Sequence, residues 1–220
     1  MQRKSLLQAL AFTLVIALTP LVTGVQATIQ KSAKKPAAPL PAVKAKTYTI
    51  VPGESSIRVF VAKAGIASFV AHDHNMAVKT LSGRVIVPAA GTAQGSLELD
   101  IDARSLVIYD KISDKDKAEI TKSMNDIVLE SGKYPKITFR STSVSNFTAS
   151  GLTVNGNLTL HGTTKPIAIP VSFTTTPQQL RATGKYTLRQ TDFGITPYSA
   201  FGGTVKVKNE VVISFNIIAR

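Results

Sequence analysis

The chain has 220 residues, of which 44% are hydrophobic, and this suits one globular domain with a substantial core plus some extra sequence. The lack of cysteine excludes a disulfide framework and anchoring through a lipid-modified cysteine. The formal net charge of +13 favours anionic partners, but nucleic acid is not expected as a partner, because there is no tryptophan and no dense Arg/Lys element with interleaved aromatic residues.

The first residues have the layout of an export signal. Arg3 and Lys4 precede an apolar run over residues 6–18, which is too short to span a bilayer comfortably. A small-residue cleavage pattern then ends at Ala27. We expect a signal peptide over residues 1–27 and a periplasmic mature protein; the alternative is an uncleaved amphipathic anchor or a buried core helix.

The next segment is rich in lysine, proline and alanine. Residues 28–46 contain no apolar period, which is typical of a semi-rigid disordered linker. Its lysines predict spacing or a loose attraction to an anionic membrane surface of the cell envelope.

From residue 47 to residue 220 the dominant pattern is a period of two, which indicates strands with one buried and one wet face. In the clearest case, residues 152–160, even positions are apolar or glycine and odd positions are polar. The pattern predicts about eight antiparallel strands, closed into a barrel or folded as a sandwich. The other strands are expected around residues 57–61, 78–87, 97–101, 137–139, 167–173, 180–188 and 211–217.

One segment breaks this rhythm. Ser113 and Asp116 form a helix start, and apolar residues then recur at helical spacing until the helix ends near Gly132. The apolar stripe consists of Ile120, Met124, Ile127 and Val128. We expect this helix to cap the open end or side of the sheet, and a shorter helical or irregular piece over residues 65–75 to do the same at Phe69.

Two histidines are the best candidates for metal chemistry. His72 and His74 are two positions apart, so on an extended strand both point to one side and can offer two imidazoles to Zn²⁺ or Cu²⁺. The remaining histidine, His161, falls in a turn, and no third ligand is evident. The alternative is a polar turn in which the two histidines and Asp73 bond one another and the backbone.

Nothing in the sequence predicts catalysis. A cysteine-free chain would need a serine activated by one of three histidines, and no nucleophile-elbow motif is present. The acidic residues between 110 and 119 alternate with lysines, which is typical of a solvated helix start. We therefore expect neither an enzyme nor a cofactor.

Several motifs occur in a specific order across Tyr48–Ala219, and with them the domain resembles the YceI-like family of polyisoprenoid-binding, lipocalin-like periplasmic proteins. They are Tyr48-Thr49-Ile50, Ser82-Gly83-Arg84-Val85, Met124–Leu129, Tyr134–Thr142, Gly156–Pro166 and Thr191–Ile195. The resemblance implies a mainly β fold, an eight-stranded antiparallel barrel with one capping α-helix and a lipid chain in its apolar interior. The chain departs from the family pattern at residues 71–75, which resemble a His-Asp-His subgroup, and at Gln190-Thr191.

Four residues are expected to line a ligand pocket, because they belong to the elements that would close the barrel. They are Phe69, Ile127, Phe139 and Phe193. Two alternatives to lipid binding stay open: a metal-binding or redox-accessory envelope protein that uses His72 and His74, and a stress-related or interaction domain whose barrel is packed solid.

Overall fold

A computed structural model describes residues 45–66, 72–88, 95–149 and 151–220, and the account below concerns these residues. The predicted signal peptide, nearly all of the predicted linker, and Phe69 lie outside them.

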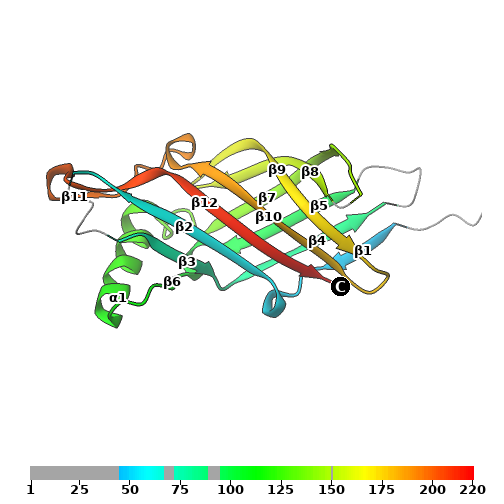
Figure 1. Ribbon diagram of the computed structural model, residues 1–220, viewed down its shortest axis with the longest axis horizontal. Helices are drawn as coiled ribbons and strands as arrows, with labels where there is room; N and C mark the ends of the chain where they lie inside the picture. Colours follow the sequence, from blue (N-terminus) through cyan, green and yellow to red (C-terminus); the bar gives the residue numbers. More distant parts are fainter. Residues whose placement is uncertain (1–44, 67–71, 89–94, 150) are drawn as a thin grey trace, which may run out of the picture. The chain divides into compact units, whose positions relative to one another are not determined.

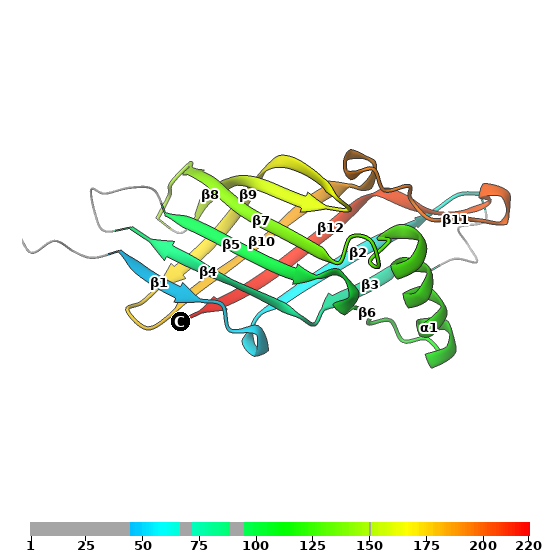
Figure 2. The same cartoon turned by 180° about the vertical axis from the view of Figure 1, so that it is seen from behind.

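The described chain folds into one antiparallel sheet with a single α-helix, as Figures 1 and 2 show. Its twelve strands are β1 (Lys46–Thr49), β2 (Ser56–Ala64), β3 (His74–Val78), β4 (Leu81–Val87), β5 (Ser96–Asp102), β6 (Leu106–Ile108), β7 (Lys136–Ser145), β8 (Gly151–Leu160), β9 (Thr163–Thr175), β10 (Leu180–Arg189), β11 (Ser199–Ala200) and β12 (Val205–Ala219). The helical elements are α1 (Asp114–Ser123), the π-helical turn η4 (Met124–Val128) and the 3-10 turns η1 (Pro52–Glu54), η3 (Ala103–Ser105), η5 (Gln190–Phe193) and η6 (Phe201–Gly203).

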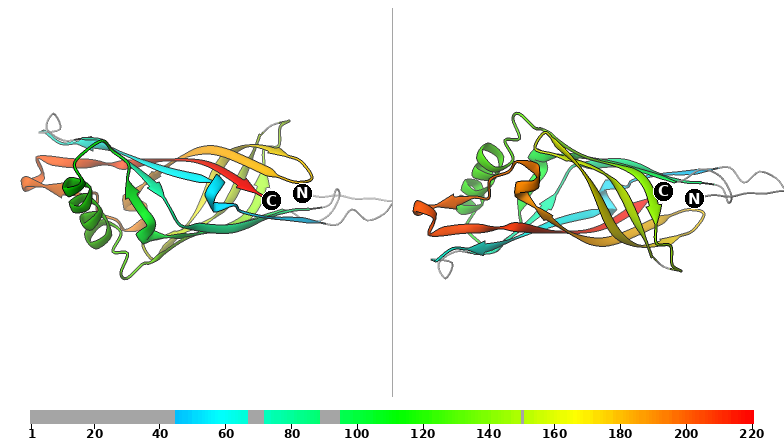
Figure 3. Two further views of the ribbon diagram at one scale, coloured as in Figure 1. Left: turned by 90° about the horizontal axis from the view of Figure 1, so that it is seen from below. Right: turned by 90° about the horizontal axis from the view of Figure 1, so that it is seen from above.

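The sheet curls until its first strand meets its last. The hydrogen-bonded order is β1-β4-β5-β7-β8-β9-β10-β12-β2-β3-β6, with β11 paired to β12. At the far end of β12, Ile50 forms a bridge with Ala219. Beside it, Thr49 and Arg220 exchange two backbone hydrogen bonds of 2.6 and 2.9 Å. These contacts join β1 to β12, so the strands from β1 to β12 surround an interior. Figure 3 shows these strands from below and above.

The expected mainly β, antiparallel, barrel-like fold with one helix is confirmed, but the structure has twelve strands rather than eight. The difference arises mostly where one long strand is bent into two. The turn η1 separates β1 from β2, and η3 separates β5 from β6. Between β3 and β4, the backbone N–H of Lys79 donates to the Ser105 carbonyl in η3. The bend between β3 and β4 therefore lies beside the bend between β5 and β6. Alternation of side chains continues through such bends, and the sequence pattern therefore does not reveal them.

Glycine makes room for aromatic rings on the inner face. A Cβ on Gly156 would lie 2.5 Å from the ring of Phe139, and one on Gly184 would lie 2.5 Å from the ring of Phe215. Gly184 stands directly opposite Phe215, and Gly156 stands diagonally to Phe139, in each case on the neighbouring strand. Strand glycines often mark such close approaches.

The helix begins as the sequence predicts and ends differently. Ser113 caps α1 by accepting a hydrogen bond from the Asp116 N–H at 3.1 Å. At its other end the helix widens into η4, where the Leu129 N–H bonds to the Met124 carbonyl at 2.8 Å, five residues back. Figure 2 shows α1 beside β6, at the end of the sheet that also carries β11. Among the described residues, no helix has the length and apolar character needed to cross a bilayer.

Candidate ligand-binding cavity

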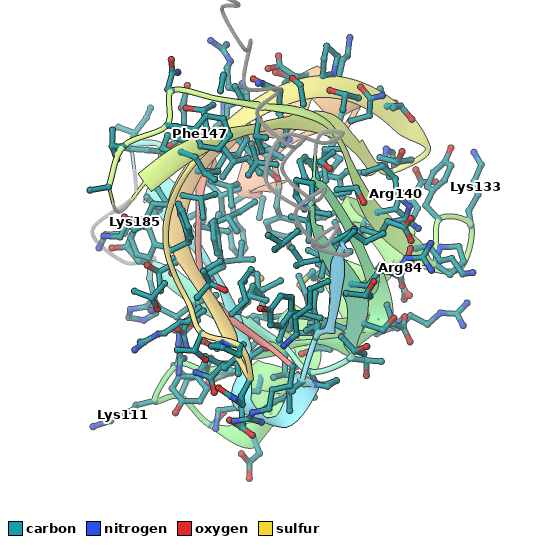
Figure 4. The ribbon with its side chains drawn as sticks, turned by 90° about the vertical axis from the view of Figure 1, so that its right-hand side faces the viewer. Arg84, Lys111, Lys133, Arg140, Phe147 and Lys185 are labelled. Atoms are coloured by element: carbon teal, nitrogen blue, oxygen red, sulfur yellow. The ribbon has the colours of Figure 1, made fainter. Side chains whose placement is uncertain are left out.

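The curled sheet encloses a cavity of about 720 Å³. This volume lies within the range of small-molecule pockets, roughly 300–1,000 Å³. Among the described residues that line it, none carries a charge, and the side chains able to form hydrogen bonds are Ser96, Ser141, Thr175, Tyr186 and Gln190. Figure 4 looks into this interior along the ring of strands.

Strand alternation explains the apolar wall. On β9, Ile167, Ile169 and Val171 line the cavity. The intervening Ala168 and Pro170 are exposed on the outer face. Because the period of a strand is two, each strand delivers every second side chain to the interior. The alternation seen in the sequence is therefore the source of the apolar lining.

The interior is hollow rather than filled. In a solid core, the largest inward side chains would lose nearly all of their accessible surface. Here no large side chain of the described residues is less than 2% exposed. Inward residues such as Val59, Leu99 and Ile213 are only partly buried and also line the cavity. The alternative of a barrel packed shut by its own side chains does not fit this structure.

Apolar side chains cover the end of the cavity near the helix. Met124 and Val128 of η4, together with Leu129, line the cavity at this capped end. A second apolar cluster packs against Val128 and Leu129 and contains Leu160, Leu188, Phe193 and Ile195, of which all but Phe193 also line the cavity. The helix thus contributes to the cavity through its π turn rather than through α1, which has no buried residue.

A histidine fixes the capped end. His161 Nε2 donates to Glu130 Oε2 at 2.6 Å, and the His161 ring lies 4.4 Å from the Tyr134 ring, centroid to centroid. His161 (φ 51°) and Glu130 (φ 42°) both have left-handed backbone conformations, which are uncommon outside glycine. Next in the turn, Gly162 (φ 72°) has no room for a Cβ, which would lie 2.5 Å from the Tyr134 ring. The β8–β9 turn is therefore bound to the segment that follows η4.

The opposite end of the cavity opens at Phe147. This residue follows β7, lines the cavity and is 66% exposed, so its ring lies where the cavity meets solvent. Pro88, after β4, and Thr175, at the end of β9, line the same end. We call this opening the mouth.

The four residues predicted to line a pocket lie in different surroundings in the structure. Phe139 of β7 is buried and lines the cavity. Phe193 is buried, with 2% exposure, but it packs in the second apolar cluster and is not part of the lining. Ile127 is 65% exposed and is not among the residues that line the cavity. Phe69 belongs to the residues that are not described. Ligand contact itself stays a prediction for all four.

The π turn explains why Ile127 does not line the cavity. The helical period of 3.6 residues places residues 120, 124, 127 and 128 on one face. The wider turn of η4 inserts an extra residue, which rotates the following side chains around the axis. As a result Val128 and Leu129 face the cavity, and Ile127 points to solvent. No simple sequence pattern predicts a π turn.

The fold also brings into the lining two polar residues that the sequence analysis did not single out for this role. Tyr186 lies on β10, Gln190 follows β10 at the start of η5, and both residues line the cavity. Burial raises the pKa of the Tyr186 hydroxyl above its usual value, and the negative charge of Asp192 adds to this. Gln190 is buried, and its Nε2 donates to the Lys208 carbonyl at 2.9 Å. The period of two along 180–190 is the signal that points to both residues.

His74 takes part in a hydrogen-bond network. Its Nδ1 donates to Asp110 Oδ2 at 2.9 Å, and the backbone N–H of Asn75 donates to Asp110 Oδ1 at 2.9 Å. Burial opposes ionisation of Asp110, but the hydrogen bonds from His74 and Asn75 outweigh it and lower the pKa of the carboxyl. His72 is exposed. Within the described ranges, no three His, Cys, Asp or Glu side chains are grouped closely enough to hold a metal ion.

Comparison with known proteins identifies relatives of this domain. A family model described as the YceI-like domain matches residues 48–219. A protein of Shewanella oneidensis named UPF0312 protein is 47% identical over 73 residues, which cover 30% of this chain and 38% of the relative. A second UPF0312 protein, from Vibrio parahaemolyticus, is 35% identical over 105 residues, covering 45% of this chain and 56% of the relative. The similarity thus spans about half or less of these curated relatives.

Two solved structures share the fold. BcnA of Burkholderia cenocepacia has a TM-score of 0.63 and 21% identity, with coverage of 78% of this chain and 99% of BcnA. A polyisoprenoid binding domain from Saccharophagus degradans, implicated in plant cell wall breakdown, has a TM-score of 0.59 and 14% identity. That match covers 79% of this chain and 97% of the domain. At these identities the similarity establishes a common fold.

Proposed function

The chain belongs to the YceI-like family, and we propose that it is an exported, non-enzymatic binding protein that holds one long apolar lipid of the isoprenoid type. The observation that carries this proposal is the cavity of about 720 Å³, whose described lining contains no charged residue. Burial of an apolar chain contributes roughly 0.8 kcal/mol per methylene before ordering costs. A flexible hydrocarbon can follow such a wall without specific polar contacts.

The ligand class is supported by the cavity and by the family. The polyisoprenoid binding domain of Saccharophagus degradans shares the fold. In our chain the polar lining groups are few and uncharged. Such a lining favours a hydrocarbon over a charged solute, because an unpaired charge inside it would lose its hydration.

Export is the second part of the proposal. It rests on the charged start, the short apolar run and the cleavage pattern within residues 1–27. Mass measurement of the protein recovered from a periplasmic extract tests it, and a chain beginning at residue 28 is expected. Recovery from the cytoplasm alone, with residues 1–27 intact, would contradict export without affecting lipid binding.

The decisive experiment is identification of the material that co-purifies with the protein. Native mass spectrometry, followed by lipid extraction, is expected to show one apolar lipid per chain. Freshly purified protein that carries no lipid, and takes up none from isoprenoid-containing vesicles, would defeat the proposal.

A matched pair of variants links the lipid to the cavity. Ala182 on β10 lines the cavity, whereas Ala168 on β9 is exposed on the outer face. Ala182→Trp is expected to lower the bound lipid severalfold because its ring occupies the ligand's space. Ala168→Trp is expected to leave the lipid content unchanged. Circular dichroism of both variants verifies that they are folded.

A further inference from the structure

The mouth has an unusual surface for a basic chain. Phe147 is both exposed and part of the cavity wall. Around it, the described residues of the connections β4–β5, β7–β8 and β9–β10 carry no charge; they are Pro88, Gly95, 146–149 and 176–179. In the whole chain, 18% of residues are charged. An apolar ring in an uncharged collar can enter an apolar medium without burying a charge.

Two lysines and one ion pair flank this collar. The pair is Arg220 with Glu54, and Arg220 also donates to Oε1 of Gln179 at 3.1 Å. The ammonium of Lys46 lies 4.8 Å from the centre of the Tyr48 ring. The Tyr48 hydroxyl donates to the Thr176 carbonyl at 2.9 Å, which places Lys46 beside the β9–β10 connection. Lys185 shares a shallow outer groove with Asn146, next to Phe147. In Figure 4, Phe147 and Lys185 lie on the same side of the ring of strands.

These lysines differ from the arginines farther along the barrel. Arg84 pairs with Glu98 at 2.9 Å, and Arg140 pairs with Asp100 at 2.6 Å. Neither Lys46 nor Lys185 forms an ion pair with a described carboxylate. The positive charges of Lys46 and Lys185 are therefore available to an outside partner. A surface with negative charge would complement them.

We propose that the docking rim, defined as Phe147 with Lys46, Lys185 and the uncharged collar, binds an anionic lipid membrane with the mouth toward the bilayer. This inference rests on the proposed lipid-binding function. Lysine attracts the anionic headgroups, and the ring of Phe147 enters the interface between headgroups and acyl chains. An apolar ligand then moves between bilayer and cavity along a path that avoids water.

The opposite end of the molecule provides the rival surface. Ile66 follows β2 and is 88% exposed, and Phe201 in η6 is 83% exposed. The two tips are neighbours, because Gly65 packs against the Thr204 carbonyl. Neither Ile66 nor Phe201 lines the cavity. A carrier docked by these tips would direct its mouth away from the bilayer, so the two orientations make opposite predictions.

The absence of cysteine allows a direct test of orientation. Phe147→Cys and Phe201→Cys, each labelled with an environment-sensitive dye in the full chain, place one reporter at either end. Vesicles of phosphatidylglycerol and phosphatidylethanolamine are expected to shift the emission at position 147 to the blue and to leave position 201 unchanged. A shift at 201 alone, equal shifts at both positions, or no shift at 147 would overturn the inference.

Charge variants test the attraction without altering the cavity wall. Lys46→Gln and Lys185→Gln are expected to weaken partitioning onto these vesicles about fivefold each, and about 25-fold together. Lys206→Gln with Lys208→Gln, near the opposite end, is the matched control and is expected to have no effect. Equal losses in both pairs would show attraction by net charge and reject a specific rim.

The lipid content of each preparation separates this inference from the proposed function. Loaded protein that does not dock by its rim overturns the inference and leaves lipid binding intact. Protein that docks by its rim but carries and takes up no lipid overturns the proposed function. Binding of phosphatidylcholine vesicles as strongly as anionic ones would also reject the electrostatic part of the inference.

Discussion

The two ends of the cavity are built differently. At the capped end, side chains far apart in sequence are joined by specific contacts, as between His161 and Glu130 at 2.6 Å. At the mouth, the Phe147 side chain is largely exposed, and its neighbours are uncharged. The mouth also has polar contacts between distant residues, such as Tyr48 with Thr176, but it keeps an exposed ring where the cavity opens. We therefore expect exchange with the surroundings to take place at the mouth.

The cap has a strained backbone, and so does Asn146 beside Phe147 at the mouth, with φ 52°. Glu130 and His161 both have positive φ, and they bond each other across two elements. Such conformations cost energy and persist where the surrounding structure determines them. Substitutions at the cap should therefore reduce the free energy of unfolding, whereas those at the mouth should change binding and docking.

The largest effect is expected at Gly162. Gly162→Ala adds a Cβ 2.5 Å from the Tyr134 ring at a residue with φ 72°, so strain and steric clash combine. We expect a loss of about 3 kcal/mol in the free energy of unfolding, measured by urea titration. Gly202→Ala is the control: its φ is 63°, but its Cβ would meet open space. It should cost about 1 kcal/mol, and equal losses would show that the Tyr134 contact is unimportant.

The next effect concerns the hydrogen bond between His161 and Glu130. His161→Ala removes a largely buried donor to a carboxylate and is expected to cost about 1.5 kcal/mol in the free energy of unfolding. Glu130→Gln keeps an acceptor for the imidazole and should cost less. If Glu130→Gln proves as damaging as His161→Ala, the charge of the carboxylate rather than the hydrogen bond holds the cap.

Part of the fold and of the cavity wall can be predicted from the sequence. Local, periodic features were predictable: the alternation over residues 152–160 became β8, and Ser113 became the cap of α1. Phe139 lines the cavity because its strand position fixes the direction of its side chain. Each of these inferences depends on a period or on a contact within one turn of the chain.

Features that depend on distant residues or on irregular turns were missed. His161 was expected in a turn, where it lies, but its partner Glu130 is 31 positions away and nothing local connects them. Ile127 is exposed because a π turn changes the helical period. Phe193 is not in the lining, because η5, which ends at Gly194 with φ 72°, directs its ring into the second apolar cluster.

A pH dependence should distinguish the network around His74 from the rest of the fold. Asp110→Asn is expected to cost about 1 kcal/mol at neutral pH, because a hydrogen-bonded carboxylate is lost. The pKa of Asp110 is lowered below its ordinary value of 3.8 in the folded protein. Its stabilisation is therefore complete above the unfolded pKa and lost as the pH falls through the folded pKa.

Unfolding curves of the wild type and Asp110→Asn should accordingly converge below about pH 4. A difference that stays constant down to pH 2 would show that Asp110 acts through packing rather than through its charge.

The smallest effect on stability, and the sharpest test of the comparison, is expected at Phe147. Its ring is 66% exposed, so Phe147→Ser removes little buried surface, and the free energy of unfolding should change by less than about 0.5 kcal/mol. The same substitution removes the apolar contact through which a lipid would enter, so transfer of a fluorescent isoprenoid from vesicles should slow severalfold. His161→Ala should show the reverse, with reduced stability and a smaller effect on transfer. If Phe147→Ser destabilises the protein as much as His161→Ala, the mouth is part of the structural framework and the division between the two ends fails.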